Sequence, residues 1–264
     1  MKLKTIGEIR DMPRNKKQRP PQDSQSKYPT TKLQPIEKAN YTTNKGIRKA
    51  VRIIPRNLHQ EEYLEYLMDD EKMIVLAQGP AGTGKSVLAM LAGIKALSEK
   101  KVSKLILSRP IVGVDDDDLG FIPGTLLDKQ MPWVRPLFDV LYEYYSTKEV
   151  ENMLENQVIE VIPLMHMRGR NIKSAFVILD EAQNTSKNAV IAITTRLCDG
   201  SKLVMTGDND QSDKRSGENG LLIFKNAIKK YGIPQYISSV EFDRTDIERH
   251  PVVTEVLNIF DLEK

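Results

Sequence analysis

The sequence predicts an α/β fold in which a mostly parallel sheet is flanked by helices. From residue 53 onward, short apolar runs alternate with segments of helical character, which is how a sheet covered by helices on both faces reads. One apolar run leads into a glycine-rich loop at 79–86, and another, 176–179, ends in two acids. The loop and the acids therefore belong at the ends of buried strands.

Each expected element rests on a local pattern. The strands are short apolar runs, and the helices are longer segments in which apolar residues recur at helical spacing, three or four positions apart. In the helix after the glycine-rich loop, Leu88, Leu91 and Ala92 stand at core spacing. Pro136 makes the ends of the following helix hard to place, and Pro251 should bend the last one. In chain order we expect a helix at 59–68, a strand at 73–77, a helix at 86–97, a strand at 105–107, a helix at 132–145, strands at 158–162, 176–179 and 202–206, and helices at 221–230 and 245–260.

The glycine-rich loop fits G-x-x-x-x-G-K-[ST], the phosphate-binding P-loop, and follows an apolar strand. Its glycines let successive backbone N–H groups curl around an anion, and the helix that follows adds the positive end of its dipole. A nucleoside triphosphate is the natural ligand. The lysine should reach the β- and γ-phosphates, and the serine hydroxyl should bind the Mg²⁺ that bridges them. The expected binding residues are Gly79, Pro80, Ala81, Gly82, Thr83, Gly84, Lys85 and Ser86.

A second motif follows the strand 176–179. Asp180 and Glu181 form the Walker B arrangement, in which an apolar strand ends in paired acids. Asp180 can hold Mg²⁺, directly or through water, and Glu181 can orient the water that attacks the γ-phosphorus. The alternative is that both acids only cap the helix that follows them.

Two glutamines are further candidates for contacts with the nucleotide. Gln211 follows the strand 202–206 in Thr-Gly-Asp-Asn-Asp-Gln, where its amide can contact the γ-phosphate or the attacking water. An ordinary turn is the alternative. Gln60 precedes the P-loop strand and can read adenine with its amide, which would favour ATP; a helix-surface glutamine is equally consistent with the spacing. His59 beside it suits a local cap or a surface position better than a ligand role.

Composition restricts the class of protein. The 264 residues suffice for one sizeable α/β domain and a tail. The single cysteine, Cys198, excludes an intramolecular disulfide. No apolar run approaches the roughly 18 residues that cross a bilayer, and the N-terminus lacks the apolar core of a secretion signal. We therefore expect a cytoplasmic protein with no membrane segment.

The first 52 residues differ from the rest of the chain. They hold 14 Lys and Arg against 4 Asp and Glu, and five prolines with no sustained apolar periodicity. This composition predicts a basic, poorly ordered tail at 1–52 before a domain at 53–264. Such a tail can bind phosphate backbones without sequence specificity, or can simply be a solvated leader.

The strings GPAGTGKS, SRPIVG, LGFIPG, MPWVRPLFD, MRGR, VILDEAQN and TGDNDQSD occur in this order, and their combination resembles the PhoH-like ATPases. The resemblance implies a RecA-like core related to superfamily 1 helicases, ATP hydrolysis with Mg²⁺, and assembly as a ring, often a hexamer. RNA unwinding or cleavage is proposed for some members. Ser212 departs from the aliphatic residue usual there, which does not touch the inferred phosphate chemistry. We expect no region outside the core that is large and structured enough for a fused nuclease domain of the PIN type, so the resemblance does not extend to metal-dependent cleavage.

A single core of this kind has no second lobe to supply the arginine that ATP hydrolysis usually needs. A neighbouring subunit would then supply it, which requires a homo-oligomer joined head to tail. The candidates are Arg109, Arg168, Arg170, Arg196 and Arg249. Three interpretations remain open: an ATPase that acts on RNA or single-stranded DNA, a nucleotide-gated oligomeric scaffold that acts on a protein partner without helicase activity, and a small-molecule kinase. A kinase shares the P-loop but normally adds an acceptor pocket and a lid, and the strings DEAQ and GDNDQ argue against it.

Overall fold

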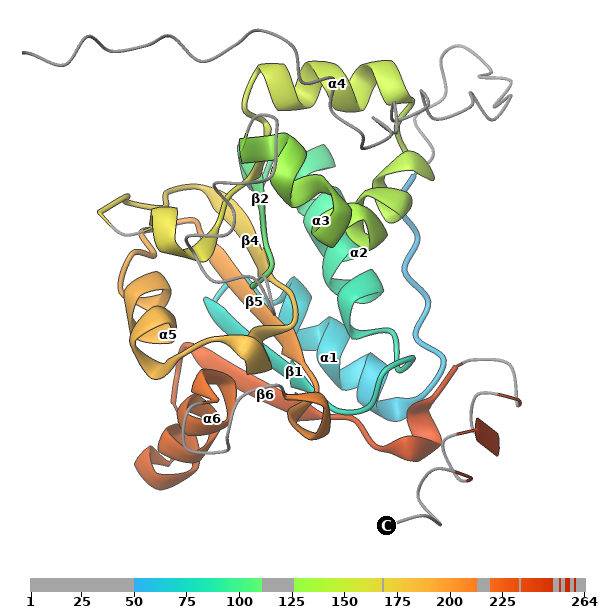
Figure 1. Cartoon of the computed structure of the whole chain (residues 1–264), viewed down its shortest axis with the longest axis vertical. Coiled ribbons are helices and arrows are strands. Elements are labelled where there is room, and N and C mark those ends of the chain that lie inside the picture. The colour runs from blue at the N-terminus through green and yellow to red at the C-terminus, as the bar shows by residue number, and fades with distance from the viewer. Residues whose placement is uncertain are drawn as a thin grey trace, which may run out of the picture. The chain divides into compact units, whose positions relative to one another are not determined.

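The computed structural model describes residues 50–110, 126–167, 169–212, 219–232 and 234–248, together with four positions near the C-terminus. Within them lies a six-stranded sheet in the order β3-β2-β4-β5-β1-β6, in which every pair of neighbours is parallel (Figure 1). The expected α/β class with a parallel sheet is confirmed. The strands are β1 (Ile74–Gln78), β2 (Lys104–Ser108), β3 (Ile159–Val161), β4 (Ala175–Leu179), β5 (Lys202–Gly207) and β6 (Ile237–Glu241).

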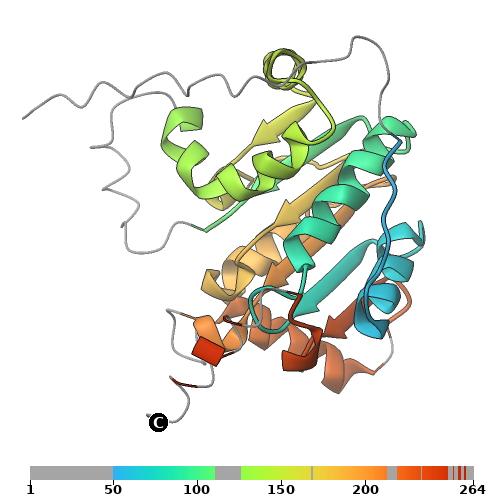
Figure 2. The ribbon, with the colours of Figure 1, turned by 90° about the vertical axis from the view of Figure 1, so that its right-hand side faces the viewer.

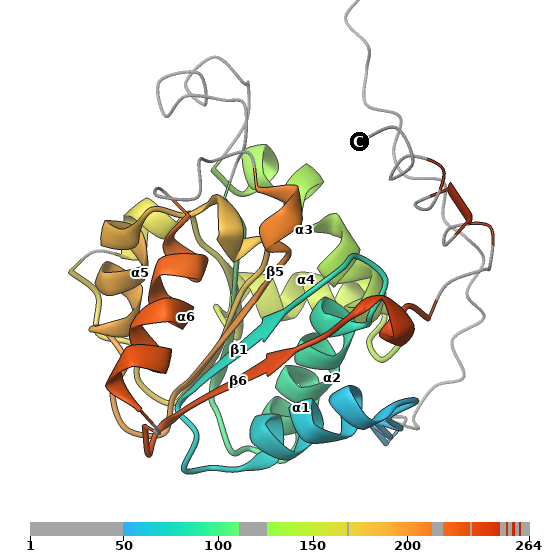
Figure 3. The same cartoon turned by 90° about the horizontal axis from the view of Figure 1, so that it is seen from below.

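Helices cover both faces of the sheet (Figures 2 and 3). Four of them pack side by side on one face: α1 (Leu58–Met68), α2 (Lys85–Ser98), α3 (Leu126–Tyr142) and α4 (Thr147–Glu155). On the other face lie α5 (Lys187–Thr194) and α6 (Gly220–Tyr231). Each face has its own apolar core, because the side chains of a strand alternate between the two faces. Among the described residues, no helix combines the length and apolar character needed to cross a membrane.

The strand order places three loops together. Strand β5 lies between β1 and β4, and its pairing sets Gly207 beside Gln78 and Met205 beside Leu179. The segments that follow these strands therefore leave the same edge of the sheet. This edge carries the glycine-rich loop after β1, the paired acids after β4 and the Asp208–Gln211 turn after β5.

Several elements differ from the expectations. Strand β6 and helices α4 and α5 were not expected, and α3 continues through Pro132 and Pro136. The helix expected at 245–260 is wrong at its start. A short 3₁₀ turn, Arg244–Asp246, occupies this place because the Asp243 carboxylate accepts the N–H of Thr245, and the chain at Ile247 is extended. Most of the remainder of that expected helix, and almost all of the expected tail, lie outside the described residues.

Candidate functional site

The loop between β1 and α2 is shaped as an anion cradle. Gly79, Gly82 and Gly84 have φ angles of 139°, 91° and 84°, a region that residues with a side chain rarely adopt. Gly84 is the N-cap of α2 and offers no side chain to the first N–H groups of the helix. These donors and the positive end of the helix dipole suit a phosphate group.

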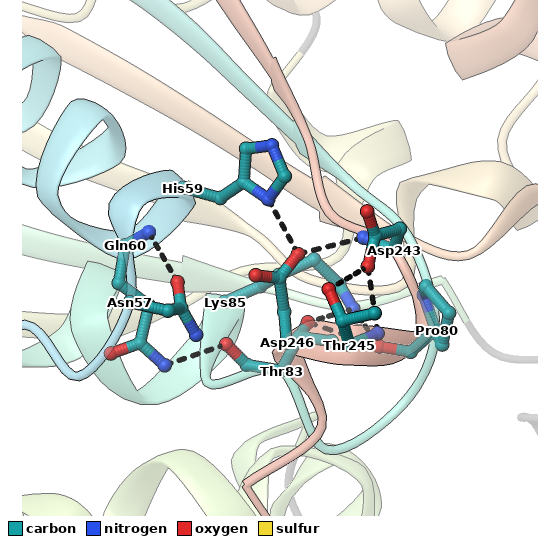
Figure 4. Close-up of polar contacts among 9 residues, drawn as sticks. All are labelled: Asn57, His59, Gln60, Pro80, Thr83, Lys85, Asp243, Thr245 and Asp246. Atoms are coloured by element: carbon teal, nitrogen blue, oxygen red, sulfur yellow. Dashed lines mark hydrogen bonds and ion pairs between the residues drawn. The ribbon is translucent and has the colours of Figure 1, made fainter.

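Lys85 lies inside this loop. Its side chain is almost fully buried, and its Nζ donates to the carbonyl oxygens of Gly79 and Pro80, each at 2.6 Å; Figure 4 draws the contact with Pro80. A third contact of 3.2 Å reaches Oγ1 of Thr83. The ammonium is therefore held by neutral acceptors at the place where the sequence predicts phosphate oxygens.

Ser86 and Asp180 meet across the edge of the sheet. The Ser86 hydroxyl donates to Oδ1 of Asp180 at 2.6 Å, and the Thr206 hydroxyl donates to the same oxygen at 2.6 Å. Asp180 and Thr206 are buried. The contact joins α2 to the end of β4, as the expected shared Mg²⁺ site requires. Thr206 was not singled out from the sequence, although its place at the end of β5 could have indicated it.

Glu181 has both carboxylate oxygens engaged. Arg109 lies 3.3 Å from Oε1 through its Nη2, and Gln183 Nε2 donates to Oε2 at 2.6 Å. Arg109 also lies 3.5 Å from Oδ2 of Asp180 through its Nη1. Glu181 has a φ angle of 54° and makes no side-chain capping bond to the short 3₁₀ turn that it precedes, Ala182–Asn184. The capping alternative is thus not what its side chain does.

Asp208, which was not given a role from the sequence, is buried beside the loop. Its carboxylate accepts the backbone N–H groups of Asp210 and Ala81, and Lys85 is close enough to act on it electrostatically. Burial raises the pKa of Asp208, and these backbone hydrogen bonds and the lysine partly oppose that rise. A carboxylate therefore faces the loop in which a phosphate is expected.

Gln211, the expected γ-phosphate contact, lies in a 3₁₀ turn, Asn209–Gln211, and its side chain is exposed. The turn is held by Asn209, which donates to Oε1 of Gln78 at 2.6 Å and so ties the loop after β5 to the end of β1. Gln211 thus stands at the expected edge of the sheet, and its role stays a prediction.

With this geometry in view, the comparisons with known proteins decide the family. The family model described as "PhoH-like protein" matches residues 52–261. The chain belongs to the PhoH-like protein family. A PhoH-like protein of Bacillus subtilis is 40% identical over 214 residues, which cover 81% of this chain and 65% of that protein. A PhoH-like protein of Mycobacterium tuberculosis H37Rv is 39% identical over 213 residues, covering 81% and 59%. The chain thus spans about three fifths of the length of these relatives.

Solved structures are more distant from this PhoH-like chain. The Hef helicase domain of Pyrococcus furiosus aligns with a TM-score of 0.41 at 12% identity, over 70% of this chain and 38% of that one. The Pif1 helicase of Candida albicans aligns with a TM-score of 0.36 at 16% identity, over 73% and 40%.

Gln60 is buried against the P-loop of the PhoH-like domain. Its Nε2 donates to the Thr83 carbonyl at 3.1 Å (Figure 4), and its Oε1 accepts the backbone N–H of Arg56 at 3.0 Å. The amide therefore holds α1 against the loop, and the surface alternative does not apply. Its expected contact with adenine stays a prediction.

A second segment braces the loop from outside. The Glu248 N–H donates to the Gly82 carbonyl at 3.0 Å, and nearby His59 Nδ1 lies 2.7 Å from Oδ2 of Asp246 (Figure 4). His59, Asp243 and Asp246 bring ligand-type atoms within 4.8 Å of one another, but hydrogen bonds within the cluster account for this proximity. His59 acts locally, as its sequence context suggests.

The arginine candidates are dispersed. Arg109 faces the acids of its own chain, whereas Arg170 pairs with Glu160 at 2.8 Å. Arg196 follows α5 at the opposite edge of the sheet, where its carbonyl accepts the N–H of Ile172. Arg168 and Arg249 lie outside the described residues.

Proposed function

We propose that this PhoH-like chain binds ATP with Mg²⁺ and hydrolyses it. The observation that supports this most is a convergence of four side chains from two separate segments at one edge of the sheet. Lys85 and Ser86 begin the helix after the P-loop, and Asp180 and Glu181 directly follow β4. A cation, a hydroxyl and two carboxylates are the groups that phosphoryl transfer to water requires.

Binding begins at the P-loop. The Lys85 ammonium exchanges the carbonyl oxygens of Gly79 and Pro80 for oxygens of the β- and γ-phosphates, which are stronger acceptors because they are charged. The N–H groups at the start of α2 bind the same phosphates. Gln60, adjacent to the loop, is proposed to contact adenine.

Ser86 and Asp180 fit Mg²⁺, because hydroxyl and carboxylate oxygens are ligands that this ion prefers. Their oxygens already lie 2.6 Å apart, and the Thr206 hydroxyl fixes the carboxylate. When bound, the ion neutralises charge on the β- and γ-phosphates.

Glu181 acts on the attacking water. Its carboxylate accepts a proton from the water as the water oxygen bonds to the γ-phosphorus and the bond to the β-phosphate oxygen breaks. The products are ADP and inorganic phosphate. Gln211 is proposed to contact the γ-phosphate or this water from the loop after β5.

We also propose a basic tail at 1–52 that brings RNA or single-stranded DNA to an ATPase domain at 53–264. The excess of Lys and Arg in the tail supports this step, since cations bind phosphate backbones in a salt-dependent manner. A homo-oligomeric ring, such as a hexamer, would let a neighbouring subunit contribute an arginine to each site.

Phosphate release from Mg²⁺-ATP tests the proposal. The wild type should release phosphate, K85A should lose nucleotide binding, and E181Q should bind ATP normally and release phosphate at least about 100-fold more slowly, as removal of a general base does. A wild type that releases no phosphate with Mg²⁺ would contradict the proposal, and wild-type rates in E181Q would contradict the role of Glu181. The same assay with a panel of RNA and single-stranded DNA polymers tests the coupling. Indifference to every polymer, with ATP-dependent oligomerisation, would favour a scaffold.

A further inference from the structure

Glu181 is held from both sides by the strands that flank its own. Strand β4 pairs with β2 and β5, and one residue beyond each neighbour acts on a different oxygen of the carboxylate. Arg109, which follows β2, approaches Oε1 at 3.3 Å. On the side of β5, the Asp208 N–H donates to Oε1 of Gln183, and Gln183 Nε2 donates to Oε2 of Glu181. The two contacts together fix the plane of the carboxylate.

Arg109, which follows β2, also contacts helix α3. Arg109 Nη1 also donates to the backbone carbonyl of Trp133 in α3, at 3.1 Å. Pro136 lies inside α3 and has no N–H for the carbonyl of Pro132, and a proline ring inside a helix disturbs the hydrogen bonding of its turn. The Trp133 carbonyl, one residue further along this disturbed turn, receives the guanidinium of Arg109. The position of α3 is thus linked to Glu181 through one side chain.

We propose that Arg109 is a positioning residue that aims the Glu181 carboxylate at the attacking water, and that α3 sets this aim through Trp133. The inference rests on the proposed ATP hydrolysis. It assigns Arg109 to its own subunit's site, whereas the sequence offered it as an arginine for a neighbouring subunit. The side chain of Arg109 is only 24% exposed, and both of its terminal nitrogens are engaged within the chain.

The contacts explain why an arginine is needed. The guanidinium presents a planar fork, so Nη1 can serve Asp180 and Trp133 while Nη2 serves Glu181. A lysine has a single nitrogen and cannot reproduce this arrangement. Without the fork, adjacent carboxylates repel each other, and Glu181, whose side chain is 34% exposed, keeps only the bond to Gln183. A general base must lie within hydrogen-bond reach of its water, so loss of aim lowers turnover rather than binding.

Steady-state hydrolysis and equilibrium binding of a fluorescent ATP analogue test the role of Arg109. We expect R109A to lower kcat about 10- to 100-fold while the dissociation constant changes less than about 3-fold. R109K restores the positive charge without the fork, so its kcat should stay at least about 5-fold below the wild type. R135A, which removes an exposed arginine of the same helix α3, should match the wild type.

The outcomes separate this inference from the proposed function. A wild type without ATPase activity contradicts the proposed function itself. An active wild type with R109A at the same kcat, an equal loss of binding and turnover, or full rescue by R109K contradicts only the positioning role. If the Tm of R109A falls below that of the wild type, R109K alone tests the proposal. Its kcat should then fall by a larger factor than its affinity for the ATP analogue, and equal factors would contradict the positioning role.

A double-mutant cycle tests the link to α3. P136A restores an N–H to the disturbed turn and should move the Trp133 carbonyl, so we expect kcat to fall about 2- to 10-fold in the wild-type background. In the R109A background the same change should have no further effect, because the connection is already lost. Equal effects of P136A in both backgrounds would show that α3 does not act through Arg109.

Discussion

The Ser86 hydroxyl donates a 2.6 Å hydrogen bond to Oδ1 of Asp180, and so joins the first turn of α2 to the end of β4. The two residues are 94 positions apart in the chain. Their contact ties the phosphate-binding loop to the acidic strand end, which is the arrangement a shared Mg²⁺ needs.

This contact predicts a change in metal requirement. S86A removes the hydroxyl oxygen that is proposed to bind Mg²⁺, while the backbone of the P-loop is retained. We therefore expect the Mg²⁺ concentration for half-maximal hydrolysis to rise about 10-fold, which corresponds to about 1.4 kcal/mol. Titration of the ATPase rate with Mg²⁺ measures it. S98A, at the other end of α2, where the hydroxyl only contacts the Lys95 carbonyl, is the control. Equal Mg²⁺ requirements in S86A and the wild type would contradict the ligand role of Ser86.

The carboxylate of Asp208 should weaken ATP binding. Because it faces the P-loop, its negative charge should repel a triphosphate, and D208N should bind ATP about 3- to 10-fold more tightly than the wild type. Burial raises the pKa of Asp208, so in the wild type the repulsion should weaken as pH falls and the group takes up its proton. Fluorescence titrations of ATP across pH, with exposed Asp210 replaced in D210N as the control, measure both. Unchanged affinity in D208N would exclude this repulsion.

The motifs could be predicted because their information is local. The P-loop is one turn between a strand and a helix, and Gly84 is needed there by its own backbone angle. Likewise Asp180 and Glu181 directly follow a short apolar run, and this run forms β4 with all of its residues buried. Such features depend on neighbours in the chain, and the sequence displays them directly.

The partners of these motifs could not be predicted, because they depend on strand order. Thr206 meets Asp180 only because β5 lies between β1 and β4. Arg109 meets Glu181 only because β2 pairs with β4, although 72 residues separate the two. Strand β6 was missed for another reason: its sequence Ile-Ser-Ser-Val-Glu has little apolar character, because it is an outermost strand of the sheet with only one neighbour.

Replacing Gly79 by alanine should strongly destabilise the fold. A Cβ at this position would lie 2.3 Å from the Phe242 carbonyl oxygen, and φ is 139°. G79A should therefore combine backbone strain with a clash and lower the free energy of unfolding by about 2–4 kcal/mol. G169A is a matched control, because φ there is also positive, at 78°, but a Cβ would meet nothing within 4 Å. Urea denaturation should give G169A a much higher free energy of unfolding than G79A, and equal values would rule out the clash.

Lys202 predicts how stability depends on pH. It begins β5, is buried, and its Nζ donates to the carbonyls of Tyr66 and Asp69 at 2.9 and 2.6 Å. Burial lowers its pKa from 10.5 to about 8, although Asp69 and Asp70 oppose the shift. Between these values the folded chain has released the proton and the unfolded chain still holds it. The unfolded state then binds more protons, so the free energy of unfolding rises with pH.

From pH 7.5 to pH 9.5 we expect the free energy of unfolding to rise by about 2 kcal/mol, which follows from 1.36 kcal/mol per pKa unit. Urea denaturation at both pH values should show this rise in the wild type relative to K202M, in which no proton is exchanged at this position. K173M removes an exposed lysine and controls for the general effect of losing a positive charge. If the free energy of unfolding of the wild type minus that of K202M stays constant or falls as pH rises over this range, Lys202 keeps its proton in the folded chain. The carbonyls of Tyr66 and Asp69 would then stabilise the ammonium more than burial destabilises it.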